Sequence, residues 1–538
     1  SSDVCSSDLY QRGAFDAKEG DFSSAGSIRM DYAAQLDDTT LALGLGDSGY
    51  QRQLFTGSST NGQHHWVYGL ESVKQDVNQG LRNSAAGNGH DNLVVKYQFG
   101  DQLSGFNLTA MLHQSDWESA TAQYTLPELS QQPLLLSNAA DNSSRNSLSA
   151  AWWRSNSQHR TQLSAYLIDY HADLDLNFEF FNNGRIIERD LNRKDTRLIS
   201  GVNLSHDWFQ NNRSVHQTGV QVRRDDLKDV ANSDITREAR ANGDAKLDAT
   251  ALYYSHRYQW NDTIRSVASL RWDQLQLDAD DTLITDFDDD TDQQLSPKLS
   301  VIFGPWHDTE YFFNLGRGIH SNDARYSYRG INTQAAERSD VELVSPLAET
   351  QSTDIGFSST LLDPITLSLS LWQLTTESEL AASRDGAYLR PSKRKGVELG
   401  ISYQPNDQLY LAFNGVLSEA QFSDEHPEGN HIPGSIEDAA VLTLSYQQQR
   451  WMTSLYANYY GASPYSEDNS ISTDSAIALD WVSLYQLTPN ILMQLELLNL
   501  LDDSDNRSDL LFTDRIAAAE AFAEDLYYQP IAPRTLRL

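Results

Sequence analysis

The sequence predicts an all-β protein, a transmembrane antiparallel β-barrel of about 22 strands with long outer loops and short periplasmic turns. Two observations predict this fold class. Segments of about ten residues in which apolar and polar side chains alternate recur along the chain, as they do in barrel strands. The connections between these segments alternate between short and long, which is expected when all loops of one length lie on the same side of a membrane.

The stretch Ile365–Leu374, ITLSLSLWQL, shows the alternation clearly. Leu367 and Leu369 lie on one face of the expected strand. Ser368 and Ser370 lie on the other face. We expect the leucine face to contact lipid and the serine face to point into the lumen or toward a plug. The same pattern recurs in Arg160–Tyr170, Arg197–Trp208, Thr263–Trp272, Ala440–Gln447 and Asn490–Leu500.

The composition agrees with a barrel and argues against a helical membrane protein. The 538 residues contain no run of about 18 apolar side chains, so no transmembrane helix is expected. The mean hydropathy is −0.53, which suits a barrel because only alternate residues of each strand face lipid. One helix-like stretch, Asp514–Leu526, lies inside a long connection.

The connections fall into two classes by length. The short ones stand beside Trp208, Trp260, Trp306, Pro364, Pro405, Trp451 and Pro489. The long ones are Ser115–Asn142, Asp173–Asp195, Arg224–Lys246, Leu277–Gln293, Ser321–Ala348, Ala381–Lys393 and Asp502–Gln529. This arrangement places the short turns in the periplasm, with tryptophan rings at the membrane–water boundary. The alternative is a soluble β-protein in which these tryptophans cap a core at the hairpin ends.

Charge and motifs exclude several classes of function. The chain has 40 Lys and Arg residues against 75 Asp and Glu residues, and the resulting charge of −35 argues against a nucleic-acid partner. Cys5 is the single cysteine, so an intrachain disulfide is excluded. The sequence has no His-Glu-x-x-His, paired-cysteine or Gly-rich phosphate-loop motif. We therefore expect no enzyme, no catalytic residue, no metal site and no cofactor.

The acidic run Asp286–Asp292, DFDDDTD, begins like a calcium-binding EF-hand loop. The match fails because Thr291 stands where such a loop needs glycine and Pro297 stands where it needs glutamate. We expect a solvated acidic outer loop, and a looser surface site for a hard cation is the alternative.

Several stretches together point to a family through their order and spacing. They are GAFDAKEGDFSSAGSIRMDY (Gly13–Tyr32), DSGYQRQLF (Asp47–Phe55), LSPKLSVIFGP followed by FFNLGRGIHSNDAR (Leu295–Arg325), LNLLDDSDN (Leu498–Asn506) and IAPRTLRL (Ile531–Leu538). With these stretches the sequence resembles the barrel portion of a TonB-dependent outer-membrane receptor. The first stretch is similar to the end of the plug domain, and the last to the final barrel strand.

The resemblance implies a domain division in which the plug is largely missing. We expect residues 1–9 to be a non-native leader, residues 10–38 to be a remnant of the C-terminal end of the plug, and residues 39–538 to be the transmembrane barrel. The N-terminal segment that engages the energy-coupling protein TonB is expected to be missing. The chain also stops at Leu538, where the family usually ends on an aromatic residue.

The resemblance implies a receptor in the outer membrane of a Gram-negative bacterium. Such a protein imports a scarce nutrient, for example a ferric siderophore or cobalamin, and its partners are outer-membrane lipid, the extracellular ligand and TonB. A monomer is expected. Two alternatives stay open, a passive porin-like channel and a soluble glycan-binding β-protein.

The candidate ligand site is the stretch His320–Gly330, which follows an expected strand. Arg325 and Arg329 offer charge for anionic oxygens. Tyr326 and Tyr328 offer rings for stacking, and the stretch also includes two hydrogen-bonding side chains, His320 and Asn322. The alternative is that these side chains only order their own loop.

Overall fold

The computed structural model describes residues 5–77, 86–118, 123–124, 140–182, 185–228, 232–234, 243–281, 290–322, 345–383, 386–427, 429–502, 506–514, 523–530 and 533–538. Every regular element in these ranges is a β-strand. In this part of the chain no helix has the length and apolar character needed to cross a membrane.

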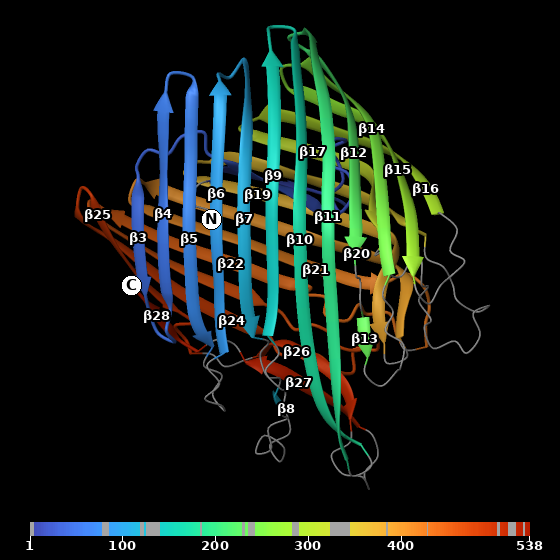
Figure 1. The fold of residues 1–538 in the computed structure, drawn as a ribbon. Coiled ribbons are helices and arrows are strands. Elements are labelled where there is room, and N and C mark those ends of the chain that lie inside the picture. Colours follow the sequence, from blue (N-terminus) through green and yellow to red (C-terminus); the bar gives the residue numbers. More distant parts are fainter. Residues whose placement is uncertain are drawn as a thin grey trace.

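In the described part of the chain, 22 strands close into an antiparallel barrel, and the predicted fold class is confirmed (Figure 1). A further short strand, β13 (Asn232–Asp234), pairs with β11 at one end. The barrel strands are β3 (Thr40–Leu45), β4 (Gln51–Asn61), β5 (His64–Val77), β6 (Ala86–Gly100), β7 (Ser104–Glu118), β9 (Ala140–Ser155), β10 (His159–Asn182), β11 (Arg185–Asn211), β12 (Ser214–Lys228), β14 (Gly243–Asn261), β15 (Ile264–Asp281), β16 (Asp290–Trp306), β17 (Thr309–Ser321), β18 (Leu347–Leu362), β19 (Ile365–Ser383), β20 (Gly386–Asn406), β21 (Leu409–Phe422), β22 (Asp438–Gln448), β23 (Trp451–Tyr460), β24 (Ala476–Thr488), β25 (Ile491–Leu498) and β28 (Thr535–Arg537).

The barrel closes between its last and first strands. The backbone N–H of Leu45 donates to the carbonyl of Leu538, and the N–H of Leu538 donates to the carbonyl of Leu45, both at 2.8 Å. On its other side β28 pairs with β25 through Glu496 and Arg537. All neighbouring barrel strands are therefore joined by backbone hydrogen bonds. A membrane-spanning barrel needs them because the lipid hydrocarbon offers no hydrogen-bonding partners.

Inward and outward faces alternate as the serine–leucine pattern predicts. Ser368 and Ser370 line an interior cavity of about 760 Å³ together with Phe15, which lies inside the barrel. Leu371 is 49% exposed on the opposite face of the same strand. The tryptophans beside the short turns are also exposed, and these are Trp208, Trp260, Trp306 and Trp451.

Parts of the predicted long loops are strands, which corrects the sequence analysis. In the expected loop Asp173–Asp195, β10 and β11 continue pairing as far as Asn182 and Arg185. In the expected loop Ala381–Lys393, β19 and β20 continue in the same way. Where the two strands extend past the rest of the barrel, they pair with each other and satisfy their backbone hydrogen-bonding groups. The length of a connection alone therefore overestimates the loop. The acidic residues 286–289 lie outside the described residues, and Asp290 begins β16.

The helix-like prediction for Asp514–Leu526 is wrong for the residues that the structure describes. Asp514 ends β26 (Asn506–Asp514), and Ala523–Leu526 begins β27 (Ala523–Pro530). These strands form a sheet of three with β8 (Gln123–Tyr124), at the end of the barrel opposite the short turns (Figure 1). At Asp514 and Ala523–Leu526, the described residues of this stretch, strand pairing overrides helix propensity.

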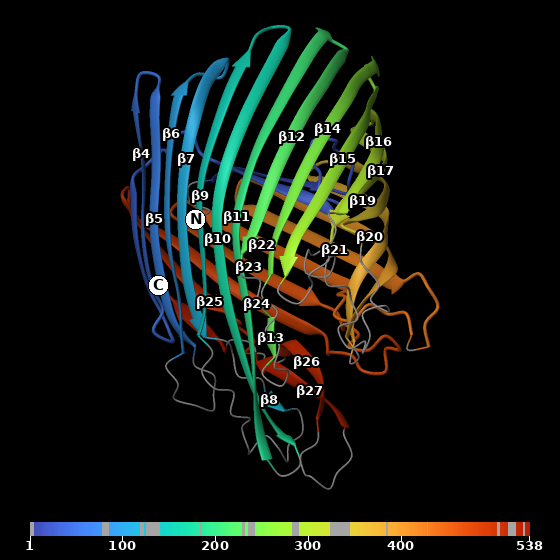
Figure 2. The ribbon, with the colours of Figure 1, turned by 45° about the vertical axis from the view of Figure 1, so that its right-hand side comes forward.

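The first part of the chain passes through the inside of the barrel (Figure 2). β1 (Cys5–Arg12) and β2 (Gly26–Tyr32) form a separate antiparallel sheet of two strands. Lys96 of the wall donates to the carbonyl of Tyr32 at 2.6 Å. The expected leader overlaps β1, and its non-native origin stays a prediction.

The pairing of β16 with β17 covers only part of their length. The register ends at Lys298 and Gly316, and beyond Gly316 β17 pairs only with β18. Pro297 is the next residue of β16 and lacks the N–H that a continued ladder uses. Past this point Ile319 packs into a buried apolar cluster whose other members are Leu227, Ala245, Leu247, Leu275, Leu277 and Leu347. The end of the β17–β18 hairpin therefore folds over the inner face of β12–β15.

Candidate functional site

The candidate site lies in the lumen, where residues 13–25, the luminal segment, dock against the barrel wall. Ala14 and Ala17 are fully buried, and Phe15 and Ser23 are nearly so. The wall at this place consists of β12 and β14–β18. A connection without regular structure can be buried only when its backbone groups find partners, so the partners define the site.

Side chains of the wall donate to the carbonyl oxygens of the luminal segment. Lys298 Nζ donates to Ala14 at 2.8 Å, and an Arg271 guanidinium nitrogen donates to Ala17 at 3.0 Å. Gln221 Nε2 donates to Lys18 at 2.9 Å. The donors come from three different strands, so the segment is held along its length.

One buried and one partly buried arginine–aspartate pair surround these contacts. Arg271 and Asp273 are each 5% exposed, and their side chains approach to 2.8 Å. Arg223 lies 3.1 Å from Asp225 and 3.2 Å from Asp21 of the luminal segment. Buried charges are tolerated when they are paired and hydrogen-bonded, so removing one member is costly.

Two glycines of β17 give the luminal segment room. A Cβ atom at Gly316 would lie 2.5 Å from the Ala14 carbonyl oxygen, and one at Gly318 would lie 2.8 Å from the Ala14 Cβ. The sequence NLGRGIHS, noted above for its family resemblance, therefore has a packing reason. Only glycine lets the strand and the segment approach this closely.

The end of the β17–β18 hairpin adds polar contacts to the same segment. Asp21 accepts from the backbone N–H and from the hydroxyl of Ser321, both at 2.7 Å. Ser24 accepts from the Thr350 hydroxyl at 2.9 Å, and its carbonyl accepts from Ser352 at 3.1 Å. The hairpin end thus links the luminal segment to the stretch that begins at His320.

The structure brings part of the predicted ligand site to the luminal segment. The His320 ring meets Phe22 edge to face with centroids 5.1 Å apart. The Asn322 side chain donates to the Ser345 carbonyl at 2.8 Å and so joins the two sides of the hairpin. The remaining predicted residues, Arg325, Tyr326, Tyr328 and Arg329, lie outside the described residues. Their role in binding stays a prediction.

Sequence reasoning did not single out the charged residues of the site, although a signal was present. Arg223 and Asp225 stand two residues apart in one strand, and Arg271 and Asp273 repeat this spacing two barrel strands further along. Residues i and i+2 share a face of a strand. Two arginine–aspartate pairs on inward faces could therefore have indicated a charged surface in the lumen.

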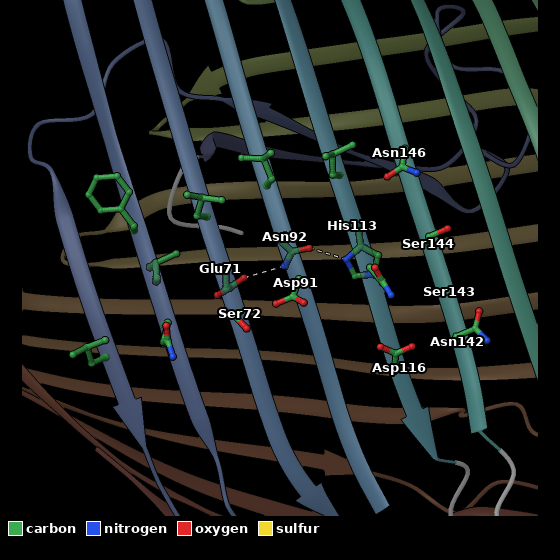
Figure 3. Close-up of a pocket in the computed structure, with 18 of the residues that line it drawn as sticks. Glu71, Ser72, Asp91, Asn92, His113, Asp116, Asn142, Ser143, Ser144 and Asn146 are labelled. Atoms are coloured by element: carbon green, nitrogen blue, oxygen red, sulfur yellow. Dashed lines mark hydrogen bonds between the residues drawn. The ribbon is translucent and has the colours of Figure 1, made fainter.

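A second concavity, of about 820 Å³, lies along β3–β9 (Figure 3). Glu71 accepts from Arg52 at 2.8 Å and from Asn92 at 3.1 Å. Asn92 and His113 are joined at 2.7 Å. This ladder crosses four strands and uses its hydrogen-bonding groups internally, so we assign it to stiffening the wall. In the described residues no group of three His, Cys, Asp or Glu side chains is arranged to hold a metal ion.

Comparison with known proteins places the chain in a family. The sequence profile described as TonB dependent receptor-like, beta-barrel matches residues 10–500. The chain belongs to this family of TonB-dependent receptors. It is therefore an outer-membrane receptor of nutrient uptake, and the predicted family and location are confirmed.

Several solved structures share the fold of this TonB-dependent receptor. The ferric-catecholate import receptor Fiu from E. coli K12 has a TM-score of 0.76 and 14% identity, over 98% of this chain and 84% of its own. The siderophore receptor PiuA from Acinetobacter baumannii has a TM-score of 0.78 and 13% identity, over 100% of this chain and 86% of its own. The ferric yersiniabactin uptake receptor FyuA from Yersinia pestis has a TM-score of 0.78 and 14% identity, over 98% of this chain and 85% of its own. No curated protein sequence matches.

Proposed function

We propose that this receptor imports a ferric siderophore through its barrel, with energy supplied by TonB. The luminal segment is the observation that carries the proposal. It lies in the lumen and is held by Lys298, Arg271 and Gln221. A passive porin conducts through an open lumen, whereas a gated importer needs an obstruction that can be displaced.

The domain division belongs to the same proposal. Residues 10–38 are the C-terminal end of the plug, and residues 39–538 are the barrel. Support comes from the burial of Ala14 and Ala17 against the wall and from the separate sheet that β1 and β2 form. In this division the plug ends inside the lumen, and the chain continues from there into β3, the first barrel strand.

The ligand class rests on two kinds of support. The similar structures named above are receptors for ferric catecholate, siderophore and ferric yersiniabactin. In this sequence Arg325 and Arg329 supply cationic groups suited to the anionic oxygens of an iron chelate. Cobalamin is the second candidate.

The contacts of the luminal segment suggest how uptake is gated. Hydrogen bonds to charged donors contribute about 1.5–3 kcal/mol each. The bonds from Lys298 and Arg271 add to those from Ser321 to Asp21. Their summed free energy exceeds thermal energy, so the luminal segment stays in place until another force displaces it. Ligand contact at His320 reaches Phe22 of the segment directly, so binding outside can bias its position.

The test is iron uptake by cells that express the full product of the gene and lack other siderophore receptors. We expect accumulation of radioactive iron from a ferric catecholate siderophore, abolished by deletion of TonB or by collapse of the proton-motive force. Equal accumulation with and without TonB would indicate a passive channel. TonB-dependent uptake of cobalamin in place of iron would retain the receptor class and reject the siderophore.

A further inference from the structure

Four imidazoles and one guanidinium gather on the outward face of the barrel at its short-turn end. Counting alternate residues along β11 places Leu204, His206 and Trp208 on the same face. Leu204 and Trp208 are 43% and 44% exposed, which identifies this face as the outer one. Cross-strand register extends the face, and the members of this imidazole patch are Arg154, His159, His206, His216 and His256.

The imidazoles of the patch lie in two close pairs. Nδ1 of His159 lies 3.3 Å from Nε2 of His206. The rings of His216 and His256 stack with centroids 4.5 Å apart and planes 3° from parallel. Two protonated rings at these separations repel each other, so the patch takes up protons most readily when an anion lies beside it.

The other contacts of the imidazoles are uncharged. His206 is joined to the Thr161 hydroxyl at 2.8 Å, and His256 to the Ser214 hydroxyl at 2.9 Å. His216 is joined to the Tyr254 hydroxyl at 2.8 Å. Among the described residues, no carboxylate forms a hydrogen bond or an ion pair with any of these four imidazoles.

In the described strands around the patch, the carboxylates have other partners: Asp101, in the turn before β7, accepts from the backbone N–H groups of Leu103 and Ser104 at 2.8 and 2.9 Å. Of the outward groups in β9–β14 near the patch, Arg154 is cationic, and Tyr254 and Tyr258 are phenols. Asp207 of β11 points inward and accepts from Gln217 at 2.7 Å. Arg160, Arg257 and Arg265 also alternate to the inner face, while Arg213 and Asp262 lie in the turns.

The patch lies at the level where a membrane presents phosphate. Trp208 stacks on His216 with centroids 5.2 Å apart, and Trp260 stands beside the next short turn. Exposed tryptophans mark the headgroup region of a membrane protein. At the short-turn end that region belongs to the periplasmic leaflet.

We propose that the imidazole patch binds the phosphate of an anionic glycerophospholipid in the periplasmic leaflet, and binds it more tightly as the imidazoles become protonated. Arg154 supplies a permanent charge, and each imidazole adds a positive charge when it is protonated. The site is independent of the lumen, so it concerns anchoring of the barrel and not the imported ligand.

Lipid binding can be measured by native mass spectrometry of the purified protein in detergent with added lipid. Phosphatidylglycerol and phosphatidylcholine serve as the anionic and zwitterionic probes, each at pH 7.5 and pH 5.5. We expect a preference for phosphatidylglycerol that rises about fivefold at the lower pH, the effect of about one added charge near a membrane surface. Equal binding of the two lipids at both pH values would overturn the proposal.

Variants identify the patch as the source of the preference. The double variant His206→Gln with His216→Gln should lose the pH-dependent increase, and Arg154→Gln should lower binding at both pH values. His64→Gln is the matched control, because His64 lies at the same end of the barrel and stacks on Tyr97 outside the patch. If the double variant fails to fold, Arg154→Gln alone decides. An unchanged preference in Arg154→Gln would reject the patch.

Discussion

The side-chain ammonium of Lys298 donates a hydrogen bond of 2.8 Å to the backbone carbonyl of Ala14. Both residues are buried, and they lie 284 positions apart in the chain. The bond joins the barrel wall to the luminal segment at the residue where the pairing of β16 with β17 ends. This single contact therefore links the position of the luminal segment to the place where β16 and β17 stop pairing.

Replacing Lys298 by methionine removes this contact while keeping most of the side-chain volume. We expect Lys298→Met to lower the free energy of unfolding by about 1–3 kcal/mol, because the Ala14 carbonyl is left buried without its donor. The measurement is reversible denaturant unfolding in detergent or lipid. Lys395→Met is the control, since Lys395 is 54% exposed and pairs with Glu419 at the surface. Equal losses in the two variants would contradict the role given to the buried bond.

The glycine at position 316 is required by the approach of the luminal segment. An added methyl group would lie 2.5 Å from the Ala14 carbonyl oxygen, so Gly316→Ala must displace the segment or the strand. We expect a loss of about 1–3 kcal/mol, typical of overpacking, seen as a lower midpoint of thermal unfolding. Gly87→Ala in β6 is the control, because a Cβ there meets nothing within 4 Å. A Gly316→Ala variant as stable as the control would show that the segment does not dock as described.

The barrel itself could be predicted from the sequence because its physical causes are local. Alternation in a stretch such as Ile365–Leu374 indicates which residues lie on each face of one strand, and the short turns indicate where the chain reverses. Where β10 and β11 end could not be predicted. Pairing beyond the membrane depends on the neighbouring strand, which the length of a connection does not reveal.

The site could be predicted only in part because its contacts are distant in sequence. The stretch from His320 was found through its residue types, and the structure places His320 against Phe22. That Ser321 binds Asp21, 300 positions away, has no local signature. Pro297 stands where the pairing of β16 with β17 ends, a role that the sequence analysis did not assign to it.

The orientation of the barrel predicts which sites an impermeant reagent reaches. With Cys5 replaced by serine, a cysteine introduced at Asn469 should react with a membrane-impermeant maleimide on intact cells. One at Asp407, in a short turn, should react only after the outer membrane is opened. Asn469 lies in the connection between β23 and β24, at the end opposite Asp407. The reverse labelling pattern would invert the proposed topology.

The alternation in β19 predicts opposite responses to a charge at neighbouring positions. Leu369 lies on the outward face between Leu367 and Leu371, and Leu369→Arg places a guanidinium among acyl chains. The cost near the bilayer midplane of a barrel is about 2–4 kcal/mol. Ser368 lines the interior cavity with Phe15, so Ser368→Arg meets water and polar groups and should cost much less. Reversible folding into lipid vesicles measures both variants on one scale. Because the two positions share a strand and a depth, a common loss of strand propensity cancels between them. Equal destabilisation would contradict the assignment of the two faces, whereas a larger loss for Leu369→Arg would locate lipid on the leucine face.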